Sequence, residues 1–277
     1  MDLSWLESLV YGLVSGAADF LPVSAQAHRA IMLKIFGGQS EGSLLRFMVH
    51  LGAFVGLMIA SSGQLSHLKR ERALAKVPKR RRKRQPNQKS MLDIQMVKTA
   101  FIASVPGFVL YYFTSRWETD LSKVALFLIL NGIMLFLPRV LPSGNKDSRS
   151  MSRLDSILIG LSGGFAMLPG ISRTGAATSV SLMRGADRQQ ALSWSLLLSI
   201  PVLVCLMGID IYGLVAYGAA LTFQAFMQYI LAGAASFCGA YLSITLLRFL
   251  AVNVGFAGFA YYSWGAALFA FILYMTI

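Results

Sequence analysis

The chain has 277 residues, of which 56% are hydrophobic and only 13% are charged, and its mean hydropathy is +0.61. About a quarter of the residues in soluble domains are charged, so this composition excludes an ordinary water-soluble protein. A membrane β-barrel would show segments of about 10 residues with alternating polarity, and the sequence has no such segments. We therefore predict an all-α polytopic membrane bundle, because lipid requires each apolar segment to satisfy its own backbone hydrogen bonds.

The net charge of +13 is concentrated in one segment, residues 69–89. This segment contains eleven Lys and Arg residues against one acid, Glu71, and so contributes +10. A basic run between two membrane spans is typical of a cytoplasmic loop under the positive-inside rule, and it can also contact anionic lipid headgroups. The sequence therefore predicts the bilayer as a partner, and no nucleic acid.

Several apolar stretches reach the roughly 20 residues that a helix needs to cross the hydrocarbon core. The predicted spans are residues 45–65, 93–113, 122–141, 190–212, 219–248 and 253–276. Two further apolar stretches, 5–36 and 154–184, are interrupted by Pro22 and Pro169. Each of their halves has about 15 residues, too few to span the core comfortably. We predict that each stretch is a re-entrant broken helix, which is tolerated where it is buried in protein or lines a wet cavity.

The basic loops also predict how the chain is oriented. If 69–89 is cytoplasmic, the smaller basic loops 142–153 and 184–189 fall on the same side. The connections 37–44 and 114–121 and both termini then lie outside. In this orientation the first re-entrant pair enters the membrane from outside and the second enters from inside.

The two broken stretches resemble each other. Leu21-Pro22-Val23-Ser24 and Leu168-Pro169-Gly170-Ile171-Ser172 lie about 147 residues apart. We predict one membrane domain over residues 1–277, built as an inverted repeat whose halves are 1–141 and 154–277, with the two polar tips meeting near the midplane. The alternative is that the two breaks are coincidental proline kinks.

The first break carries Asp19, Ser24, Gln26, His28 and Arg29 within a short stretch of intramembrane sequence. Ionisable groups inside a membrane are costly, so they are candidates for function by default. Either Asp19 or His28 can act as a general base. The alternatives are structural: Asp19 can cap a helix or pair with an arginine, His28 can bond across helices, and Gln26 can pair with backbone.

The second break carries Gly170, Ser172, Arg173 and Thr174. A guanidinium group is a forked cation that suits phosphate oxygens, and helix N-termini after each proline offer further N–H donors to an anion. Serine hydroxyls can instead bond to their own helix. We predict that both breaks converge on one phosphate-handling site, in which Arg173 is the main phosphate contact.

Both breaks match motifs of a known family. The first break fits the pattern E-G-x-T-E-F-L-P-V-S-S-T-G-H at Gly16, Phe20, Leu21, Pro22, Val23, Ser24 and His28. The second fits P-G-x-S-R-S-G at Pro169, Gly170, Ser172, Arg173 and Gly175, and His50-Leu51-Gly52 fits a short H/Q-L-G turn between them. On these residues the chain resembles the undecaprenyl-pyrophosphate phosphatases of the bacitracin-resistance type.

The resemblance implies hydrolysis of undecaprenyl diphosphate to undecaprenyl phosphate and phosphate, which recycles the cell-wall lipid carrier. It implies a multi-pass protein of the bacterial plasma membrane whose active site opens outward. It also implies a divalent cation, Mg²⁺ or Ca²⁺, for which Asp19 is the remaining ligand. The implied catalytic residues are Asp19, Ser24, His28 and Arg173. The implied substrate-binding residues are Gln26, Gly170, Ser172, Arg173 and Thr174.

The departures from the family pattern leave other functions open. Ser15 stands where the family has its first Glu. Asp19 stands in place of the second Glu and has a side chain one methylene shorter, and Ala25 replaces a proposed nucleophilic serine. Arg46 stands where the family has an acid, and can either reach the outer interface or enlarge the anion site. The alternatives to the phosphatase are a flippase or transporter for polyprenyl phosphate and a lipid-phosphate-binding paralogue without turnover. The oligomeric state is not fixed by the sequence, and a homodimer is one possibility.

Overall fold

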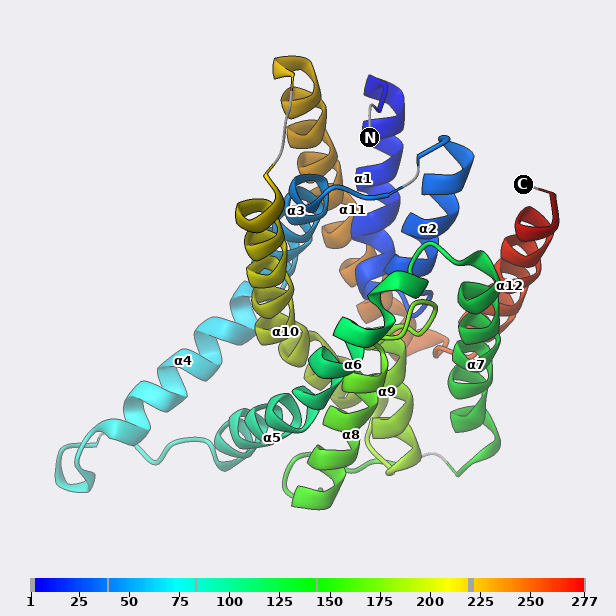
Figure 1. Ribbon diagram of the computed structural model, residues 1–277. Coiled ribbons are helices and arrows are strands. Elements are labelled where there is room, and N and C mark those ends of the chain that lie inside the picture. The colour runs from blue at the N-terminus through cyan, green and yellow to red at the C-terminus, as the bar shows by residue number, and fades with distance from the viewer. Residues whose placement is uncertain (1–2, 39, 83, 143, 219–221, 277) are drawn as a thin grey trace.

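The computed structural model describes residues 3–38, 40–82, 84–142, 144–218 and 222–276. These residues form helices and connecting loops, and none of them forms a β-strand (Figure 1). The predicted all-α membrane bundle is confirmed. Six segments are long and apolar enough to span a membrane. They are α3 (Ser43–Ala60), α5 with α6 (Gln88–Ser104 and Pro106–Thr114), α7 (Leu121–Val140), α10 (Arg188–Tyr217), α11 (Phe223–Asn253) and α12 (Gly258–Thr276).

The spans differ from the predicted ranges at a few points. The first ends at Ala60 rather than at residue 65, and α4 (Ser62–Lys76) continues in another direction as a separate helix. The second is divided at Pro106, because proline has no N–H for the helical ladder. The predicted span 219–248 begins at residues 219–221, and these lie outside the described residues, as does Lys83 of the basic loop.

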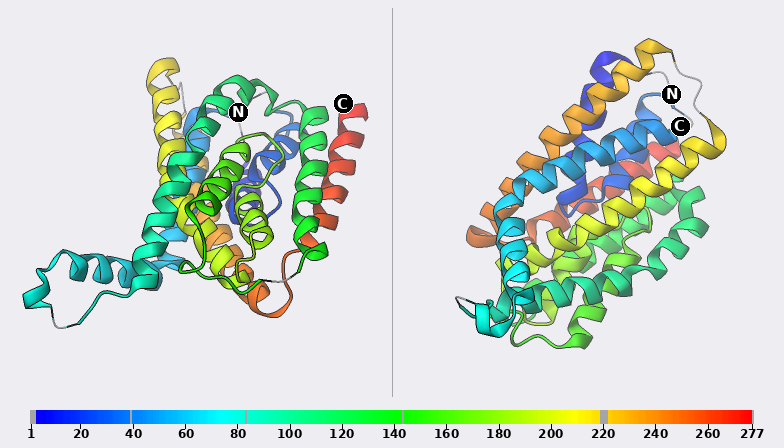
Figure 2. Two further views of the ribbon diagram at one scale, coloured as in Figure 1. Left: turned by 90° about the horizontal axis from the view of Figure 1, so that it is seen from below. Right: turned by 90° about the vertical axis from the view of Figure 1, so that its left-hand side faces the viewer.

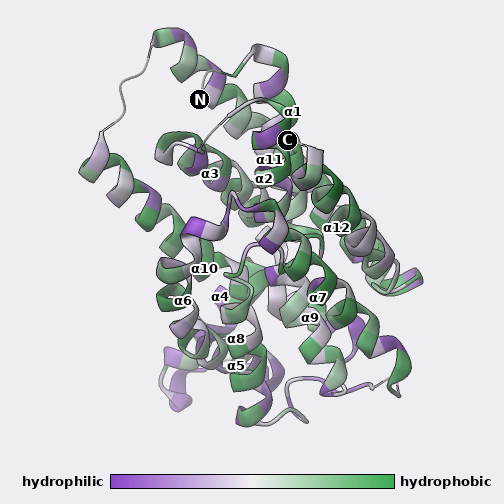
Figure 3. Ribbon diagram, turned by 45° about the vertical axis from the view of Figure 1, so that its right-hand side comes forward, coloured by the Kyte–Doolittle hydropathy of each residue, from purple (hydrophilic) through white to green (hydrophobic). Residues whose placement is uncertain are grey.

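The outer surface of the bundle is apolar, as a membrane protein requires. Figure 3 shows hydrophobic residues along α7 and α12, while hydrophilic residues gather towards α4 and α5 and at the ends of other helices. Exposed side chains on α7 include Leu126, Ile129 and Ile133, and those on α12 include Leu268 and Phe269. A soluble protein rarely exposes such continuous apolar surface, so these faces contact lipid.

Both broken stretches form helix pairs that are too short to cross a membrane. The first pair is α1 (Trp5–Phe20) and α2 (Ala25–Ile35), and the second is α8 (Arg153–Phe165) and α9 (Arg173–Met183). The helices have 16, 11, 13 and 11 residues, so the longest is only about 24 Å long at 1.5 Å per residue. Figure 1 shows the pairs entering from opposite ends of the bundle, and hydrogen bonds join their tips.

The two pairs begin and turn with the same local chemistry. Ser4 starts α1 and Ser152 starts α8, each with a capping box in which an acid three residues later bonds back to the cap. Ser24 caps α2 and Ser172 caps α9. Ser4 and Ser152 are 148 positions apart in the chain, and so are Ser24 and Ser172. The repeat interpretation stays a prediction, and this equal spacing favours it.

Glycines allow the first helix of each pair to lie directly against a long span. A Cβ atom on Gly12 or Gly16 of α1 would stand 2.0 Å from a carbonyl oxygen of α11. A Cβ atom on Gly160 of α8 would stand 2.0 Å from the carbonyl oxygen of Ala100 on α5. Small residues at helix contacts let backbones approach in this way in membranes. The motif residue Gly16 is therefore required by packing.

The basic loop is folded rather than extended. Figures 1 and 2 show α4 projecting away from the bundle, and the loop returns through the short helix η1 (Lys79–Arg81) to α5. Glu71 accepts hydrogen bonds from the guanidinium group of Arg84 and from the backbone N–H of Asn87. The bonds from Arg84 are the main reason that the pKa of Glu71 falls to about 2. The single acid of the loop thus holds its two ends together.

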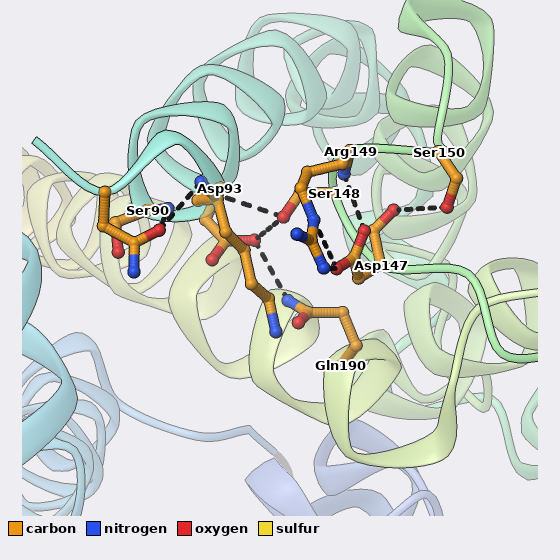
Figure 4. A network of polar contacts seen from close by, with 9 residues as sticks. Ser90, Asp93, Asp147, Ser148, Arg149, Ser150 and Gln190 are labelled. Atoms are coloured by element: carbon orange, nitrogen blue, oxygen red, sulfur yellow. Dashed lines mark hydrogen bonds and ion pairs between the residues drawn. The ribbon is translucent and has the colours of Figure 1, made fainter.

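A buried carboxylate, that of Asp93, connects several elements at the end of the bundle that carries the basic loop. Figure 4 shows Ser148 and Gln190 directed at Asp93 of α5. Asp93 Oδ1 accepts hydrogen bonds from Ser148 Oγ at 2.7 Å, Gln190 Nε2 at 3.0 Å and Trp194 Nε1 at 2.8 Å. The 144–152 connection and α10 are thereby tied to α5. Sequence analysis did not single out Asp93, although it is an acid within a predicted span.

Replacing Asp93 with alanine tests this junction. The change removes the shared acceptor of three buried side chains, of which Ser148 keeps a bond to the carbonyl oxygen of Lys89, so we expect unfolding to become easier by about 3 kcal/mol. Denaturant titration in detergent measures the change. Asp147→Ala is the matched control, because Asp147 pairs with the exposed Arg149 on the same connection, and it should leave the midpoint unchanged. Equal midpoints for both variants would contradict the assigned role.

Candidate functional site

The tips of the two helix pairs are joined by hydrogen bonds that cross from one half to the other. Asn131 of α7 donates from Nδ2 to the carbonyl oxygen of Pro22 at 3.1 Å and accepts from the backbone N–H of Ser172 at 2.9 Å. Ser172 Oγ donates to the carbonyl oxygen of Leu21 at 3.2 Å. Thr174 Oγ1 donates to the carbonyl oxygen of Asp19 at 3.3 Å. The predicted convergence of the two breaks is present in the structure.

Arg173 and Asp19 face each other at this junction. Arg173 Nη2 lies 3.7 Å from Asp19 Oδ1, and both side chains are 9% exposed. Arg173 Nε donates to Ser199 Oγ at 3.3 Å, whereas the buried Nη2 has no hydrogen-bond partner. A buried guanidinium group with an unpaired N–H is costly. Its geometry leaves a donor available for a ligand.

Two neighbouring cavities, which share lining residues, lie at the junction. The inner pocket has a volume of about 40 Å³ and is lined by both tips, with Asp19, Ser24, Ser172 and Arg173 among its residues. The outer chamber has a volume of about 510 Å³ and is lined partly by residues 40–41 and 115–119. Gln26 and Arg29 line both cavities. These two side chains therefore lie between the inner pocket and the outer chamber.

Arg29 is the second buried cation of the site. It is 6% exposed, and its Nε lies 3.4 Å from Glu41 Oε2. Its Nη1 is buried without a hydrogen-bond partner. Sequence analysis counted Arg29 among the costly intramembrane charges but gave it no role, because the family motif ends at His28.

Arg46, which lines the outer chamber, contacts two acids. Arg46 Nε lies 2.5 Å from Asp210 Oδ1 and its Nη1 lies 3.5 Å from Glu118 Oε2. His50 Nδ1 lies 2.6 Å from Asp210 Oδ2, as expected for a histidine that bonds between helices. Burial raises the pKa of Glu118, an effect that Arg46 opposes. Asp210 was missed from the sequence, although an acid in the otherwise apolar span 190–212 was the available signal.

His28 is not among the residues that line either cavity. Its Nδ1 lies 2.8 Å from the carbonyl oxygen of Ser24, and its Nε2 lies 2.7 Å from the hydroxyl oxygen of Tyr262 on α12. The two rings are stacked with centroids 5.7 Å apart. The predicted catalytic role of His28 therefore requires the ring to leave Tyr262, and it stays a prediction.

Ser24 and Gln26 are positioned at the inner pocket. Ser24 has φ +68°, a left-handed conformation that is rare for a residue with a side chain. Its Oγ caps α2 by accepting from the N–H of Ala27 at 3.4 Å. Gln26 Nε2 donates to Glu118 Oε1 at 3.3 Å, and its buried Oε1 has no hydrogen-bond partner. These geometries are compatible with the predicted roles, which stay predictions.

Gly170 and Thr174 support the site without lining the inner pocket. Gly170 has φ +118°, and a Cβ atom there would stand 2.6 Å from Phe127 Cβ. Glycine is thus required by the turn and by its contact with α7. Thr174 uses its hydroxyl group to bond the opposite tip. Their predicted contacts with substrate are not tested.

The donor atoms of the inner pocket do not form a site for a divalent cation by themselves. Among the described residues, no group of three or more His, Cys, Asp or Glu side chains is arranged to hold a metal ion. Asp19 is the one carboxylate in the described lining of the pocket, which also contains Arg29 and Arg173. Mg²⁺ and Ca²⁺ need six or more oxygen ligands. The predicted Mg²⁺ or Ca²⁺ stays a prediction, and the chemistry below does not depend on it.

Comparisons with known proteins decide the family. The profile of the family described as bacitracin resistance protein BacA matches residues 8–269. The chain belongs to this family. Undecaprenyl-diphosphatase of Carboxydothermus hydrogenoformans is 31% identical over 93% of both chains. Undecaprenyl-diphosphatase 1 of Shouchella clausii is 30% identical over 73% of this chain and 72% of the relative, and undecaprenyl-diphosphatase of Halothermothrix orenii is 24% identical over 95% of both.

Ala25 and Ser15 both depart from the BacA family motif, but they lie at different places relative to the inner pocket. Ala25 lines the inner pocket, so a methyl group faces the cavity where the motif has a serine hydroxyl. Ser15 is 1% exposed and its buried Oγ has no hydrogen-bond partner. Ser15 is not among the residues that line either cavity. The added cation, Arg46, is neutralised by two acids and does not carry a free charge into the pocket.

Replacing Asn131 with alanine tests the junction between the tips. The change leaves the buried N–H of Ser172 and the carbonyl oxygen of Pro22 without these partners, so we expect a loss of about 2–4 kcal/mol in stability. Thermal unfolding in detergent measures it. Asn253→Ala is the control, because Asn253 is exposed and bonds only within its own helix. A wild-type melting temperature for Asn131→Ala would contradict the bridging role.

Proposed function

We propose that this protein hydrolyses undecaprenyl diphosphate to undecaprenyl phosphate and phosphate. The observation that carries the proposal is the buried Arg173, which lines a pocket built from both motifs and whose Nη2, 3.7 Å from Asp19 Oδ1, has no hydrogen-bond partner. Charge neutralisation by fixed donors in a low-dielectric pocket is the main requirement for phosphoryl transfer. The relatives named undecaprenyl-diphosphatase support the same reaction and the same lipid substrate.

In the proposed reaction, a water molecule attacks the distal phosphorus atom. The bond between this phosphorus and the bridging oxygen breaks, so that phosphate and the lipid monophosphate are formed. Asp19 accepts the proton of the attacking water, because its carboxylate lines the inner pocket beside Arg173. Arg173 stabilises the charge on the phosphoryl oxygens. Water serves as the nucleophile, since position 25 has no hydroxyl group and the hydroxyl groups of Ser24 and Ser172 are engaged in hydrogen bonds to backbone.

We also propose that the protein lies in the bacterial plasma membrane with its outer chamber open to the outside. The basic loop 69–89 and the 142–153 connection lie at one end of the bundle, and the positive-inside rule assigns that end to the cytoplasm. The chamber is lined by residues of the 36–42 and 114–120 connections, which this rule assigns to the outside. The reaction would thus use lipid diphosphate in the outer leaflet.

The reaction is tested by phosphate release from a prenyl diphosphate by the purified protein. Arg173→Ala should lower the rate by about 10³-fold, because it removes the main donor to the transferred group. Arg149→Ala is the control, since Arg149 forms an exposed pair with Asp147, and it should keep the wild-type rate. A folded wild-type protein that releases no phosphate, or an active Arg173→Ala variant, would contradict the proposal.

The orientation is tested by labelling single cysteines in intact cells. In a background with Cys205 and Cys238 replaced, a membrane-impermeant maleimide should label Arg116→Cys. It should label Arg80→Cys only after the cells are made permeable. Both positions are exposed in the structure, so access depends on the side of the membrane. The reverse pattern would overturn the assignment.

Ala25 favours one alternative, in which the same pocket binds lipid phosphate for flipping and does not hydrolyse it. Two opposed broken helices are also common in transporters. Proteoliposomes that contain a labelled polyprenyl phosphate distinguish the two functions. Movement of the label between leaflets without phosphate release would support the alternative.

A further inference from the structure

Arg29 lines both the inner pocket and the outer chamber, and therefore lies between them. The inner pocket, at about 40 Å³, has room for about three water molecules. This space is too small for two phosphoryl groups. A diphosphate with one phosphoryl group in the inner pocket must therefore place the other beside Arg29 and Gln26.

The guanidinium group of Arg29 is arranged to receive an anion. Its side chain is 7% exposed and its Nη1 is buried without a hydrogen-bond partner. Glu41 lies 3.4 Å from Nε, which is the other side of the guanidinium group. Glu41 can thus fix the orientation of the side chain while Nη1 remains available. Arg173 presents the same combination of burial and an unpaired nitrogen at the inner pocket.

The two guanidinium groups act on each other through space. Arg29 makes the electrostatic potential at Arg173 more positive. Asp19 makes the potential at both guanidinium groups more negative. The residues that line the inner pocket include two guanidinium groups and one carboxylate, and Glu41 balances Arg29 from the outer chamber. A cluster whose arginines are each paired with an acid already supplies the cations that a diphosphate needs, and it offers a divalent cation only one carboxylate in the described lining of the inner pocket.

The geometry points to a two-arginine clamp in which Arg173 and Arg29 each hold one phosphoryl group of a prenyl diphosphate, so that the diphosphate binds without a divalent cation. This inference rests on the proposed function, because it takes a prenyl diphosphate as the ligand. Arg29 is then the residue that distinguishes a diphosphate from a monophosphate. Glu41 is a positioning residue that acts through Arg29.

The test is calorimetric binding to the full chain in detergent with EDTA, with farnesyl methylenediphosphonate as a diphosphate probe that cannot be hydrolysed and farnesyl monophosphate as the comparison. Wild-type protein should bind the diphosphate at least about 10-fold more tightly than the monophosphate, since a charged hydrogen bond contributes a factor of roughly 10 to 100. Arg29→Met should remove most of this preference and leave monophosphate affinity within about twofold. Arg116→Ala, which changes an exposed cation of the outer chamber, should keep the preference.

Arg29→Met leaves Glu41 as a largely buried charge without this partner, so this variant can fail to fold. The double variant Arg29→Met with Glu41→Gln removes both charges, and Arg29→Lys keeps a cation without the fork. The double variant should lose the preference and Arg29→Lys should retain part of it. A preference that survives in folded Arg29 variants, or that disappears from wild-type protein in EDTA, would overturn the clamp.

The binding experiment separates the clamp from the reaction. Phosphate release together with an unchanged preference in Arg29 variants would reject the clamp and keep the phosphatase. A preference that depends on Arg29, without any phosphate release, would keep the clamp and reject hydrolysis.

Discussion

The fold depends on hydrogen bonds that join two broken helices inside the membrane and give partners to the backbone groups exposed at each break. Each break exposes carbonyl and amide groups that lipid cannot bond, and the cost of leaving one unpaired is several kcal/mol. Asn131 and the hydroxyl groups of Ser172 and Thr174 bond to backbone groups of the tips, across the junction between the two halves. The same bonds fix the two tips in one position, and this position brings Arg173 of the second half beside Asp19 of the first.

Charge around the junction follows from the cost of burying ions. Arg29, Arg46 and Arg173 each have an acidic partner from another element, namely Glu41, Asp210 and Asp19. Pairing reduces the cost of burial, but a buried pair contributes little net stability. Arg46 contacts two acids, whereas Arg29 and Arg173 each keep a buried nitrogen without a hydrogen-bond partner. This difference separates a structural cation from two that can hold an anion.

The sequence was sufficient to predict the bundle, the spans and the two breaks, because apolar length and proline are local signals. It also predicted that Asp19, Ser24, Ser172 and Arg173 share a site, because both motifs could be placed on helix tips. The sequence could not show that His28 turns towards Tyr262, since the direction of a side chain depends on the packing of α2 against α12. It could not pair Arg46 with Asp210 or Arg29 with Glu41 either, because those contacts join distant elements.

The convergence of the two tips is tested most directly by cross-linking. Ala25 and Ile171 come from opposite halves and both line the inner pocket. In a background with Cys205 and Cys238 replaced, Ala25→Cys with Ile171→Cys should be joined in high yield by a short bifunctional thiol reagent in native membranes. Asn131→Ala in the same background should reduce the yield. Cysteines that both react with a monofunctional reagent yet form no cross-link would contradict a shared pocket.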